Sequence, residues 1–363
     1  MAKHEAESKH WGLKITVIVL IMVILGVAYA AVSLYAKTEK VVTEHLKKFD
    51  YIDISKEDLD IDPEAAENLK GYKNIVLLGV DTRKGEKDNE CRSDAIVIVT
   101  INKKTNEVNL TSVARDSYLD LEEEGYHTLD KVTHAHAYGG PVNTIRALNR
   151  NLDLNIDAYM RVNWVSVAKV IDEIGGIKVK IKANELSEMN RVNKMTAKTV
   201  KGKYKQFNKA KKYKLNGLEA VTYCRIRKGE SGGDPARADR MRKTIKKIIS
   251  KAKGMGLHNL VKTADAVLPS IQTSMSPDEM WKLMEKYLKY KFVGSKTWPY
   301  NLGGYQLDHG SGAIWYDLPM TLESNVERFH RKVFGQKEYT PSDRVLEISR
   351  NIMADLAQYR AGN

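Results

Sequence analysis

Three short apolar runs constrain the fold of this chain more than any other feature. They cover residues 75–80, 95–101 and 108–113, are rich in Val and Ile, and are separated by turns rich in Lys, Asn, Asp and Gly. Runs of this length and composition, bounded by such turns, are typical of β-strands joined by short connections. The segment 74–116 is therefore predicted to form three strands of one sheet, paired as an antiparallel meander.

Charged residues gather at one end of these predicted strands. In a meander, the end of the first strand, the start of the second and the end of the third lie at the same edge. Arginines bind phosphate oxygens through two parallel N–H groups, and paired carboxylates hold a hard cation such as Mg²⁺. Strand ends are often charged because they meet solvent, but six charges at one edge favour a site for an anion with a metal ion. These residues are Asp81, Arg83, Arg92, Asp94, Arg115 and Asp116.

Length and charge limit the classes of partner. The chain has 363 residues, of which 42% are hydrophobic, so it can bury the core of one large domain or two ordinary ones. Its 59 Lys and Arg residues exceed its 46 Asp and Glu residues, and the formal net charge is +13. This excess predicts an anionic partner, which could be nucleic acid, an anionic membrane face, a phosphorylated lipid or an acidic polymer.

An uncharged apolar run at 15–36 is long enough to cross a hydrocarbon core of about 30 Å. We expect a transmembrane signal anchor there, behind a short cytoplasmic tail at 1–14 and ahead of an extracellular stalk at 37–70. A cleaved signal peptide is the alternative, supported weakly by Ala28, Ala30 and Ala31. Lysines on the two sides of the run are nearly balanced, so charge alone does not orient the span.

The cysteines and two histidines point away from a metal centre. No spacing of Cys and His suggests zinc, and Cys91 and Cys224 are expected to be two unpaired small residues rather than one disulfide. His134 and His136 lack a third ligand nearby in sequence, so we expect them to pack and form hydrogen bonds beside the turn at Gly139 and Gly140. Lys131, which opens the polar segment 130–140, is expected to contact phosphate.

The middle of the chain mixes helices with strands. A helix is expected from 141 to about 152, with Pro141 in its first turn. A strand at 159–164, a helix at 165–174 and a strand at 177–181 are read as a β-α-β unit. The predicted fold class is therefore α/β or mixed α+β.

A basic stretch at 191–214 holds ten Lys and Arg residues and no acidic residue, with Tyr204, Phe207 and Tyr213 interleaved. This composition resembles a nucleic-acid groove. On an external domain, a surface for anionic lipids or polymers and a solvated loop are the better readings, and the sequence does not separate them.

Two further predicted helices carry arginines. A short helix within 216–228 would present Arg225 and Arg227, and a basic helix from about 236 to 252 would begin after Asp234 as N-cap. Arg237 and Arg240 lie three residues apart, on one face near the N-terminus of that helix, which itself attracts anions. The remainder, 257–363, has amphipathic helices at about 277–289 and 342–358 and no catalytic motif, and is expected to complete the domain with helices.

Four separated motifs occur in a fixed order: LLGVDTR at 77–83, RSDAI at 92–96, SVARDSYL at 112–119 with KVTHAHAYGG at 131–140, and YCRIRK followed by GDPARADRMR within 223–242. With these motifs the sequence resembles the LytR-CpsA-Psr proteins, membrane-anchored phosphotransferases of bacterial cell envelopes. The resemblance places a catalytic domain at 71–256. It implies a central, mostly antiparallel or mixed sheet flanked by helices, with an apolar pocket for a lipid tail.

The resemblance also implies an activity. Such a protein would transfer a glycopolymer, such as wall teichoic acid or capsular polysaccharide, from a polyprenyl-pyrophosphate carrier to peptidoglycan, and could hydrolyse the pyrophosphate as a side reaction. The implied catalytic residues are Asp81, Asp94 and Arg115, and the two aspartates would bind Mg²⁺, or Mn²⁺ in its place, or remove a proton. The implied pyrophosphate ligands are Arg83, Arg92, Arg115, Lys131, Arg225, Arg227, Arg237 and Arg240.

One position departs from the family pattern. The last motif often has Gln between two arginines, whereas this chain has Met241 between Arg240 and Arg242. A non-catalytic binder of lipid pyrophosphate or anionic polymer is therefore the alternative function, with a membrane-bound transcription attenuator beside it. A DNA-binding regulator is disfavoured, and no nucleic-acid partner is expected, because carboxylates stand among the arginines and no helix-turn-helix pattern occurs.

Overall fold

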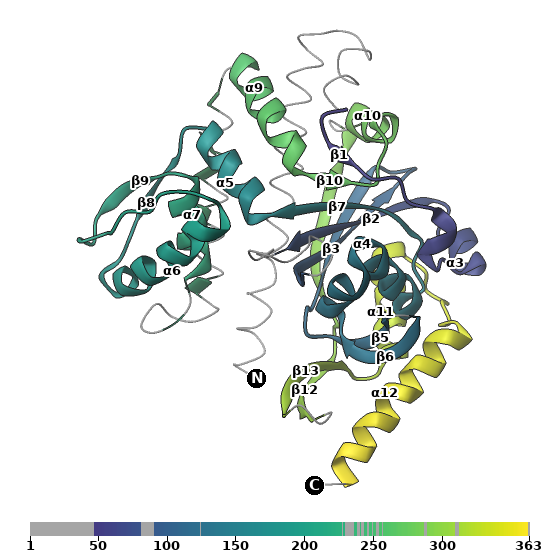
Figure 1. Ribbon diagram of the computed structural model, residues 1–363. Helices are drawn as coiled ribbons and strands as arrows, with labels where there is room; N and C mark the ends of the chain where they lie inside the picture. Colours follow the sequence, from purple (N-terminus) through teal and green to yellow (C-terminus); the bar gives the residue numbers. More distant parts are fainter. Residues whose placement is uncertain are drawn as a thin grey trace. The chain divides into compact units, whose positions relative to one another are not determined.

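The computed structural model describes residues 47–361 apart from 81–90, 124, 227, 229–235, scattered positions between 238 and 256, 287–288 and 309–311. The chain forms two compact units, which we describe separately (Figure 1). The sheet unit contains the described residues of 53–160 and 289–361, and the helical unit contains those of 47–52 and 161–286.

The predicted three-stranded meander is the centre of the sheet unit. β2 (Tyr72–Val80), β3 (Ser93–Asn102) and β4 (Glu107–Val113) pair antiparallel, with Val76 opposite Ile98 and Ile98 opposite Thr111. β7 (Ile156–Asn163) lies beside β2, and β11 (Lys291–Trp298) pairs parallel to β4. The sheet is therefore mixed, as predicted, and one of its strands comes from the C-terminal region.

The C-terminal region was expected to be helical, and that expectation is incomplete. Besides β11 it contains β12 (Leu302–Leu307) and β13 (Ile314–Pro319), which form an antiparallel hairpin. The helices are α11 (Leu322–Phe329), a π-helical turn η6 (His330–Phe334) and α12 (Asp343–Ala361). Gly and Lys interrupt the apolar residues of β11, so the sequence lacks the regular alternation from which a strand is predicted.

The segment after β4 also differs from expectation. β5 (Tyr118–Glu123) and β6 (Tyr126–Lys131) form a hairpin that was not predicted, and α4 (Val132–Leu152) begins nine residues before the expected start. The Gly-Gly-Pro sequence marks a kink inside α4, where Gly140 has φ 68° and ψ −155°. Glycine adopts positive φ without steric cost, so the helix bends there and resumes at Pro141.

The core of the sheet unit lies between one face of the sheet and the helices α4, α11 and α12. Val76, Leu78 and Ile98 contribute from the strands, and Tyr118 and Trp298 are completely buried among them. Each large apolar side chain buried in this way contributes roughly 1.5–3 kcal/mol relative to exposure. The residues before β2 also pack here, as η1 (Lys56–Leu59) and α3 (Pro63–Asn68), so part of the predicted stalk is folded.

The helical unit consists of short elements. Its helices are α5 (Trp164–Glu173), η2 (Ala183–Glu185), α6 (Leu186–Thr199), α7 (Gly217–Arg225), α9 (Leu257–Val267), η4 (Leu268–Ser270) and α10 (Pro277–Glu285). The short strands are β8 (Ile177–Lys180) with β9 (Lys212–Leu215), and β1 (Asp50–Tyr51) with β10 (Gln272–Thr273). Because β8 pairs antiparallel with β9, in a different sheet from β7, the predicted β-α-β unit is wrong.

Two expectations about helices concern positions that are partly or wholly undescribed. The described positions of the predicted basic helix, such as Ala236, Arg240 and Thr244, are helical. Among the residues with described placement, no helix has the length and apolar character to span a membrane. The predicted anchor at 15–36 and the tail before it lie outside the described residues.

A buried carboxylate ties α12 to α4. Asp153 follows α4 in the left-handed conformation and is 4% exposed. Its carboxylate accepts hydrogen bonds from the backbone N–H of Ser342 at 2.8 Å, from the Ser342 hydroxyl at 2.7 Å and from the Tyr339 hydroxyl. Replacing Asp153 by Ala would leave these donors without an acceptor. We expect Asp153→Ala to lower the free energy of unfolding by about 2–3 kcal/mol.

Urea denaturation followed by circular dichroism tests this expectation. Asp153→Asn, which keeps an acceptor and tolerates positive φ, should lose less than Asp153→Ala. The exposed Lys337, in the same connection to α12, supplies the control Lys337→Ala, expected to change stability by no more than about 0.5 kcal/mol. Equal stability of Asp153→Ala and Lys337→Ala would show that the carboxylate does not hold α12.

Candidate functional site

The charged edge predicted from the meander exists. β2 ends at Val80, opposite Ser93 at the start of β3, and β4 ends at Val113, opposite Ile96. Arg92, Asp94, Arg115 and Asp116 lie at or just beyond these strand ends, whereas Asp81 and Arg83 lie outside the described residues. Arg92 is exposed.

Four side chains at this edge form a continuous chain of ion pairs. Arg115 Nη1 lies 2.6 Å from Asp94 Oδ1, and Arg115 Nε lies 3.2 Å from Asp116 Oδ2. The other oxygen of Asp116, Oδ1, lies 3.0 Å from Lys131 Nζ. Lys131 is fifteen residues from Asp116 in sequence, and the structure brings the two side chains together at this edge, while the contact of Lys131 with phosphate stays a prediction.

The backbone holds Lys131 in this position. The β5–β6 hairpin returns the chain to its starting point, where the N–H of Val132 donates to Ser117 O at 2.9 Å and the N–H of Thr133 donates to Arg115 O at 3.0 Å. Lys131 is thus the last residue of β6 and the N-cap of α4. The signal for this hairpin was the buried alternation of Tyr118, Leu119 and Leu121, which the surrounding acidic residues obscured.

The electrostatics of the edge keep the Arg115 guanidinium charged and oriented. Burial acts to lower the pKa of Arg115, but the adjacent carboxylates of Asp94 and Asp116 outweigh it and the pKa is raised. The side chains of Arg115 and Asp94 remain 36% and 45% exposed. The two negative and two positive charges of these four residues balance. The ion pairs hold the side chains in position, and the exposed parts of Arg115 and Asp94 leave the edge open to an anion.

The β12–β13 hairpin adjoins this edge (Figure 1). The backbone N–H of Asp317 donates to Asp116 O at 2.8 Å, and Asp317 forms a parallel bridge with Ser117. Lys131 Nζ lies 5.2 Å from the centre of the Tyr316 ring, within the range of a cation–π contact. Neither contact was predicted, because 201 residues separate Asp116 from Asp317 and 185 separate Lys131 from Tyr316.

A second cluster next to Lys131 consists of Asp130, His134 and Tyr138. The Tyr138 hydroxyl donates to Asp130 Oδ2 at 2.5 Å, and His134 Nδ1 lies 2.6 Å from the same oxygen. Burial acts to raise the pKa of Asp130, but these hydrogen bonds outweigh it and the pKa is lowered. Together with the bond of His136 Nδ1 to Cys91 O at 2.7 Å, these contacts confirm that the two histidines form hydrogen bonds.

The cysteine prediction is also confirmed, since Cys91 and Cys224 are both free and buried. Across the described ranges, no three His, Cys, Asp or Glu side chains are grouped so as to hold a metal ion. A metal at the strand edge would therefore need ligands beyond the described carboxylates, such as phosphate oxygens of a substrate.

The predicted arginines of the helical unit differ in environment. Arg225 is the last residue of α7, and its Nη1 donates to Thr199 Oγ1 at 3.3 Å. Arg240 is only 2% exposed, and its guanidinium pairs with Glu185 at 3.3 Å and donates to Ile226 O. Arg240 is thus held inside the unit by its own partners, an environment that sequence spacing could not reveal. Arg237 is half-buried, whereas Arg227 and Met241 lie outside the described residues.

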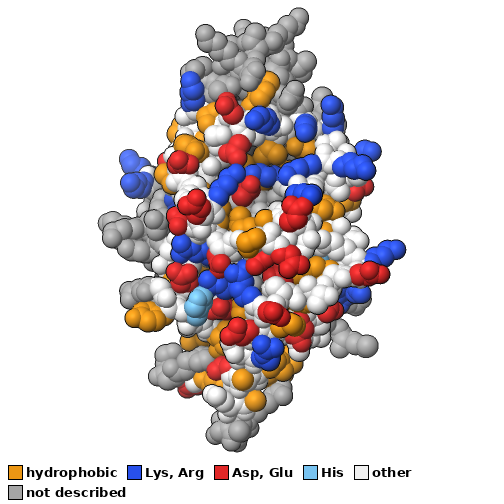
Figure 2. Space-filling view, turned by 90° about the vertical axis from the view of Figure 1, so that its right-hand side faces the viewer, with side chains coloured by type: hydrophobic (Ala, Val, Ile, Leu, Met, Phe, Trp, Pro, Cys, Tyr) orange, Lys and Arg blue, Asp and Glu red, His pale blue; other side chains and the backbone are white. Residues whose placement is uncertain are grey.

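The basic stretch at 191–214 is not a row of exposed aromatic residues. Phe207 is 2% exposed, and its ring packs edge-on against Tyr213 at 5.0 Å between ring centres. Lys205 pairs with Glu219 at 2.8 Å, so at least one of the lysines is neutralised within the unit. Figure 2 shows another face of the molecule, on which Lys and Arg side chains lie next to Asp and Glu side chains. Phe207 and Tyr213 are therefore structural, whereas Tyr204 is 44% exposed.

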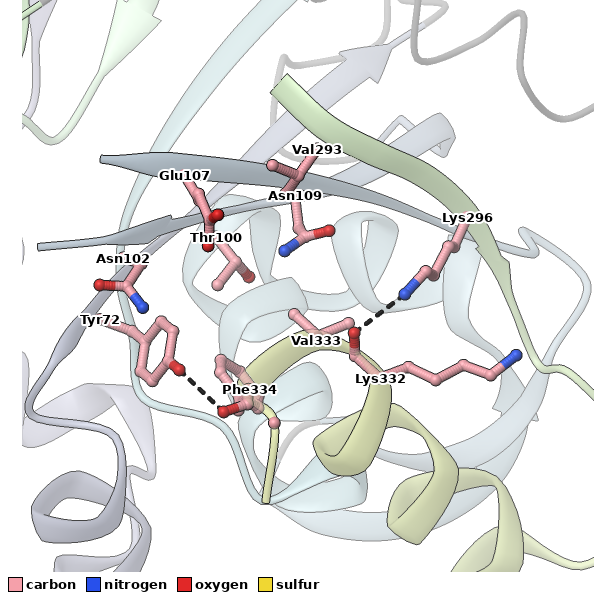
Figure 3. Close-up of a pocket in the computed structure, with 11 residues that line it drawn as sticks. Tyr72, Thr100, Asn102, Glu107, Asn109, Val293, Lys296, Lys332, Val333 and Phe334 are labelled. Carbon is pink, nitrogen blue, oxygen red and sulfur yellow. Dashed lines mark hydrogen bonds between the residues drawn. The ribbon is translucent and has the colours of Figure 1, made fainter. Parts of the chain in front are cut away.

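A cavity of about 360 Å³ lies at the opposite end of β2 and β3 from the charged edge (Figure 3). Tyr72, which begins β2, donates to Phe334 O at 2.8 Å, and Lys296 Nζ donates to Lys332 O at 2.9 Å. None of the residues predicted for the site lines this cavity. The candidate site is therefore the charged edge with Asp94, Arg115, Asp116 and Lys131.

Comparison with known proteins identifies relatives of this chain. The chain is 30% identical over 337 residues to the polyisoprenyl-teichoic acid–peptidoglycan teichoic acid transferase TagU of Bacillus subtilis, covering 90% of this chain and 100% of that protein. It is 34% identical over 184 residues to the transferase TagT of the same organism, covering 50% of this chain and 53% of that protein.

A solved structure, that of protein gbs0355 from Streptococcus agalactiae, is similar in fold, with a TM-score of 0.57 and 24% identity over 76% of this chain and 93% of that chain. Residues 28–325 match the model of the LytR_cpsA_psr family. Because this match spans most of the chain and includes all four motifs, the protein belongs to the LytR-CpsA-Psr family.

Proposed function

We propose that this protein transfers an anionic glycopolymer, of the wall teichoic acid or capsular polysaccharide type, from a polyprenyl-pyrophosphate carrier to peptidoglycan. The observation that carries the proposal is the chain of ion pairs from Asp94 through Arg115 and Asp116 to Lys131. The full-length similarity to TagU, whose name states a teichoic acid transfer to peptidoglycan, supports the same reaction class.

The proposed reaction replaces a phosphoanhydride bond of the pyrophosphate with a phosphate ester bond to peptidoglycan. A hydroxyl oxygen of peptidoglycan attacks the phosphorus that bears the glycopolymer, the bridging P–O bond of the pyrophosphate breaks, and polyprenyl phosphate leaves. The hydroxyl proton passes to a carboxylate at the strand edge, for which Asp81 and Asp94 are the two candidates. Water in place of the sugar hydroxyl would give the pyrophosphatase side reaction.

The role proposed for Arg115 follows from its geometry. Its guanidinium is already oriented by two carboxylates, Asp94 at 2.6 Å and Asp116 at 3.2 Å. An incoming phosphate would take the place of these carboxylates, so binding would not have to order the arginine side chain. Charge-assisted bonds from such a prealigned fork stabilise the charge that develops on the leaving phosphate. Lys131, 13% exposed and held by Asp116, would bind a second oxygen.

Additional positive charge is needed, because the four ion-paired residues sum to zero while a pyrophosphate carries several negative charges. Arg92 and the predicted Arg83, Arg225, Arg227 and Arg237 are the proposed protein sources. The edge also suits Mg²⁺ or Mn²⁺, since Asp94 offers a carboxylate 45% exposed, and Mg²⁺ is commonly bound by one or two carboxylates with substrate phosphates. Asp94 and Asp81 would hold the ion, which when bound would neutralise phosphate charge.

We further propose that the protein is a single-pass protein of the bacterial cell membrane with its catalytic part outside. The uncharged run at 15–36 supports this localisation, and a polyprenyl carrier would present its pyrophosphate at the membrane surface.

Replacing Arg115 tests the arginine role. With full-length protein in detergent, a synthetic polyprenyl-pyrophosphate glycan and peptidoglycan oligomers, we expect Arg115→Ala to lower kcat/KM by at least about 100-fold, because phosphate stabilisation in the transition state is lost. Arg115→Lys, which keeps the charge but not the fork, should fall between wild type and Arg115→Ala. Polymer joined to peptidoglycan is measured by gel electrophoresis.

Arg191 provides the matched control, because it is also paired with a carboxylate but is exposed on α6. Arg191→Ala should transfer at close to the wild-type rate. Tight binding of the donor by wild type with no transfer to any acceptor would favour the non-catalytic binder over the transferase.

Replacing Asp94 tests the metal role separately. We expect transfer by wild type to stop on chelation with EDTA and to return with Mg²⁺ or Mn²⁺. Asp94→Asn, which removes the charge but keeps the shape, should raise the Mg²⁺ concentration for half-maximal rate about tenfold or more. Titration of the transfer rate with Mg²⁺ gives this value.

Asp116→Asn is the comparison, because Asp116 also pairs with Arg115 but is not a proposed ligand. Its Mg²⁺ requirement should stay close to that of wild type even if its rate falls. An unchanged Mg²⁺ requirement in Asp94→Asn, together with a lower rate, would assign Asp94 to positioning Arg115 rather than to a metal.

A further inference from the structure

One large aromatic ring beside the candidate site is exposed and yet held in place. Trp315 on β13 is 51% exposed. The six-membered part of its indole lies against Gly304 of β12, where an added Cβ would come within 2.1 Å of Cζ2 and 2.5 Å of Cη2. The indole Nε1 donates to Asp317 Oδ1 at 3.1 Å. The ring is therefore fixed on one face and at one edge, while much of its surface meets solvent.

An aromatic ring across a glycine stabilises a β-hairpin, and single exposed apolar residues are common. That explanation accounts for the covered face of Trp315 but not for its polar surroundings. The strand register places Gln306 directly opposite Trp315 and Gly304 opposite Asp317. Alternation along the strands then puts the indole, the Gln306 amide and the Asp317 carboxylate on one face of the hairpin.

The hairpin that carries this face contacts the candidate site. The next residue, Tyr316, points to the other side of β13, where it is 4% exposed and lies under Lys131. Asp317, two residues from Trp315, is bonded through its backbone N–H to Asp116 O. The hairpin thus presents Tyr316 to Lys131 on one face and Trp315 to solvent on the other.

We propose that Trp315 is a stacking platform for a pyranose ring of the acceptor glycan, with Gln306 and Asp317 bonding its hydroxyl or amide groups. The C–H bonds on one face of a pyranose carry partial positive charge and pack against the negative face of an aromatic ring. The Asp317 carboxylate repels phosphate groups, so an uncharged glycan ring fits the platform better than the anionic donor polymer. This assignment adds an acceptor-binding residue to the proposed transfer reaction. It rests on the proposed function, because that function identifies the bound sugar as the acceptor.

Binding of a defined sugar tests the platform without requiring transfer. Chitotetraose and disaccharide-repeat fragments of peptidoglycan glycan are titrated into full-length protein in detergent by calorimetry. Trp315→Ala should weaken binding of both about tenfold, whereas Trp315→Phe should stay within about threefold of wild type, because it keeps an aromatic face. Tyr126, 77% exposed on the β5–β6 hairpin, supplies the control Tyr126→Ala, which should bind like wild type.

A second variant keeps the tryptophan and moves it. Gly304→Ala introduces a Cβ into the position of the indole ring, so the ring must shift, and glycan affinity should fall as in Trp315→Ala. Both variants should bind inorganic pyrophosphate as wild type does, which would show that the neighbouring site is intact. Absence of glycan binding by wild type, or equal binding by Trp315→Ala and wild type, would overturn the platform.

Kinetics separate this proposal from the proposed function. In the transfer reaction, Trp315→Ala should raise the KM for peptidoglycan oligomers about tenfold and leave the KM for the lipid donor unchanged. If wild type binds glycan through Trp315 but transfers nothing, the transferase proposal fails and the platform stands. If transfer occurs with an unchanged acceptor KM in Trp315→Ala, the platform alone fails.

Discussion

The structure of the candidate site depends on the placement of one guanidinium between two carboxylates. Arg115 is the second residue after β4, Asp94 belongs to β3, and the ion pair at 2.6 Å therefore joins two neighbouring strands at their ends. The second carboxylate, that of Asp116, forms ion pairs with both Arg115 and Lys131. Because each charge is compensated in the free protein, the site can be partly buried without an unpaired ion, and in our proposal it exchanges its carboxylate partners for phosphate.

The same ion pairs explain why elements distant in sequence meet at this edge. The β5–β6 hairpin carries Lys131 back to Arg115, and the β12–β13 hairpin reaches Asp116 through the backbone of Asp317. Beneath the second hairpin, Tyr316 packs against Tyr118, whose hydroxyl donates to Asp355 of α12. The C-terminal region therefore packs against the charged edge and, in our proposal, also binds the acceptor sugar.

Predictions from the sequence succeeded where a local pattern had one structural outcome. Alternating Val and Ile between polar turns identified β2, β3 and β4, and a meander has only one edge at which Asp94 and Arg115 can meet. Predictions failed where local signals were ambiguous. Gly139 and Gly140 before Pro141 fit either a helix start or a kink, and Arg240 fits either a ligand of phosphate or a partner of Glu185. The choice in each case depends on contacts far along the chain.

The sequence by itself determined the family, through four ordered motifs, and the strand edge that holds Asp94 and Arg115. Only the tertiary structure decided which other residues join that edge. Lys131, Tyr316 and Trp315 are placed there by hairpins whose ends are fixed by long-range backbone hydrogen bonds, and such bonds have no local sequence signature. The physical reason is that neighbouring residues set strand formation, whereas burial and pairing over the whole chain decide which strand ends meet.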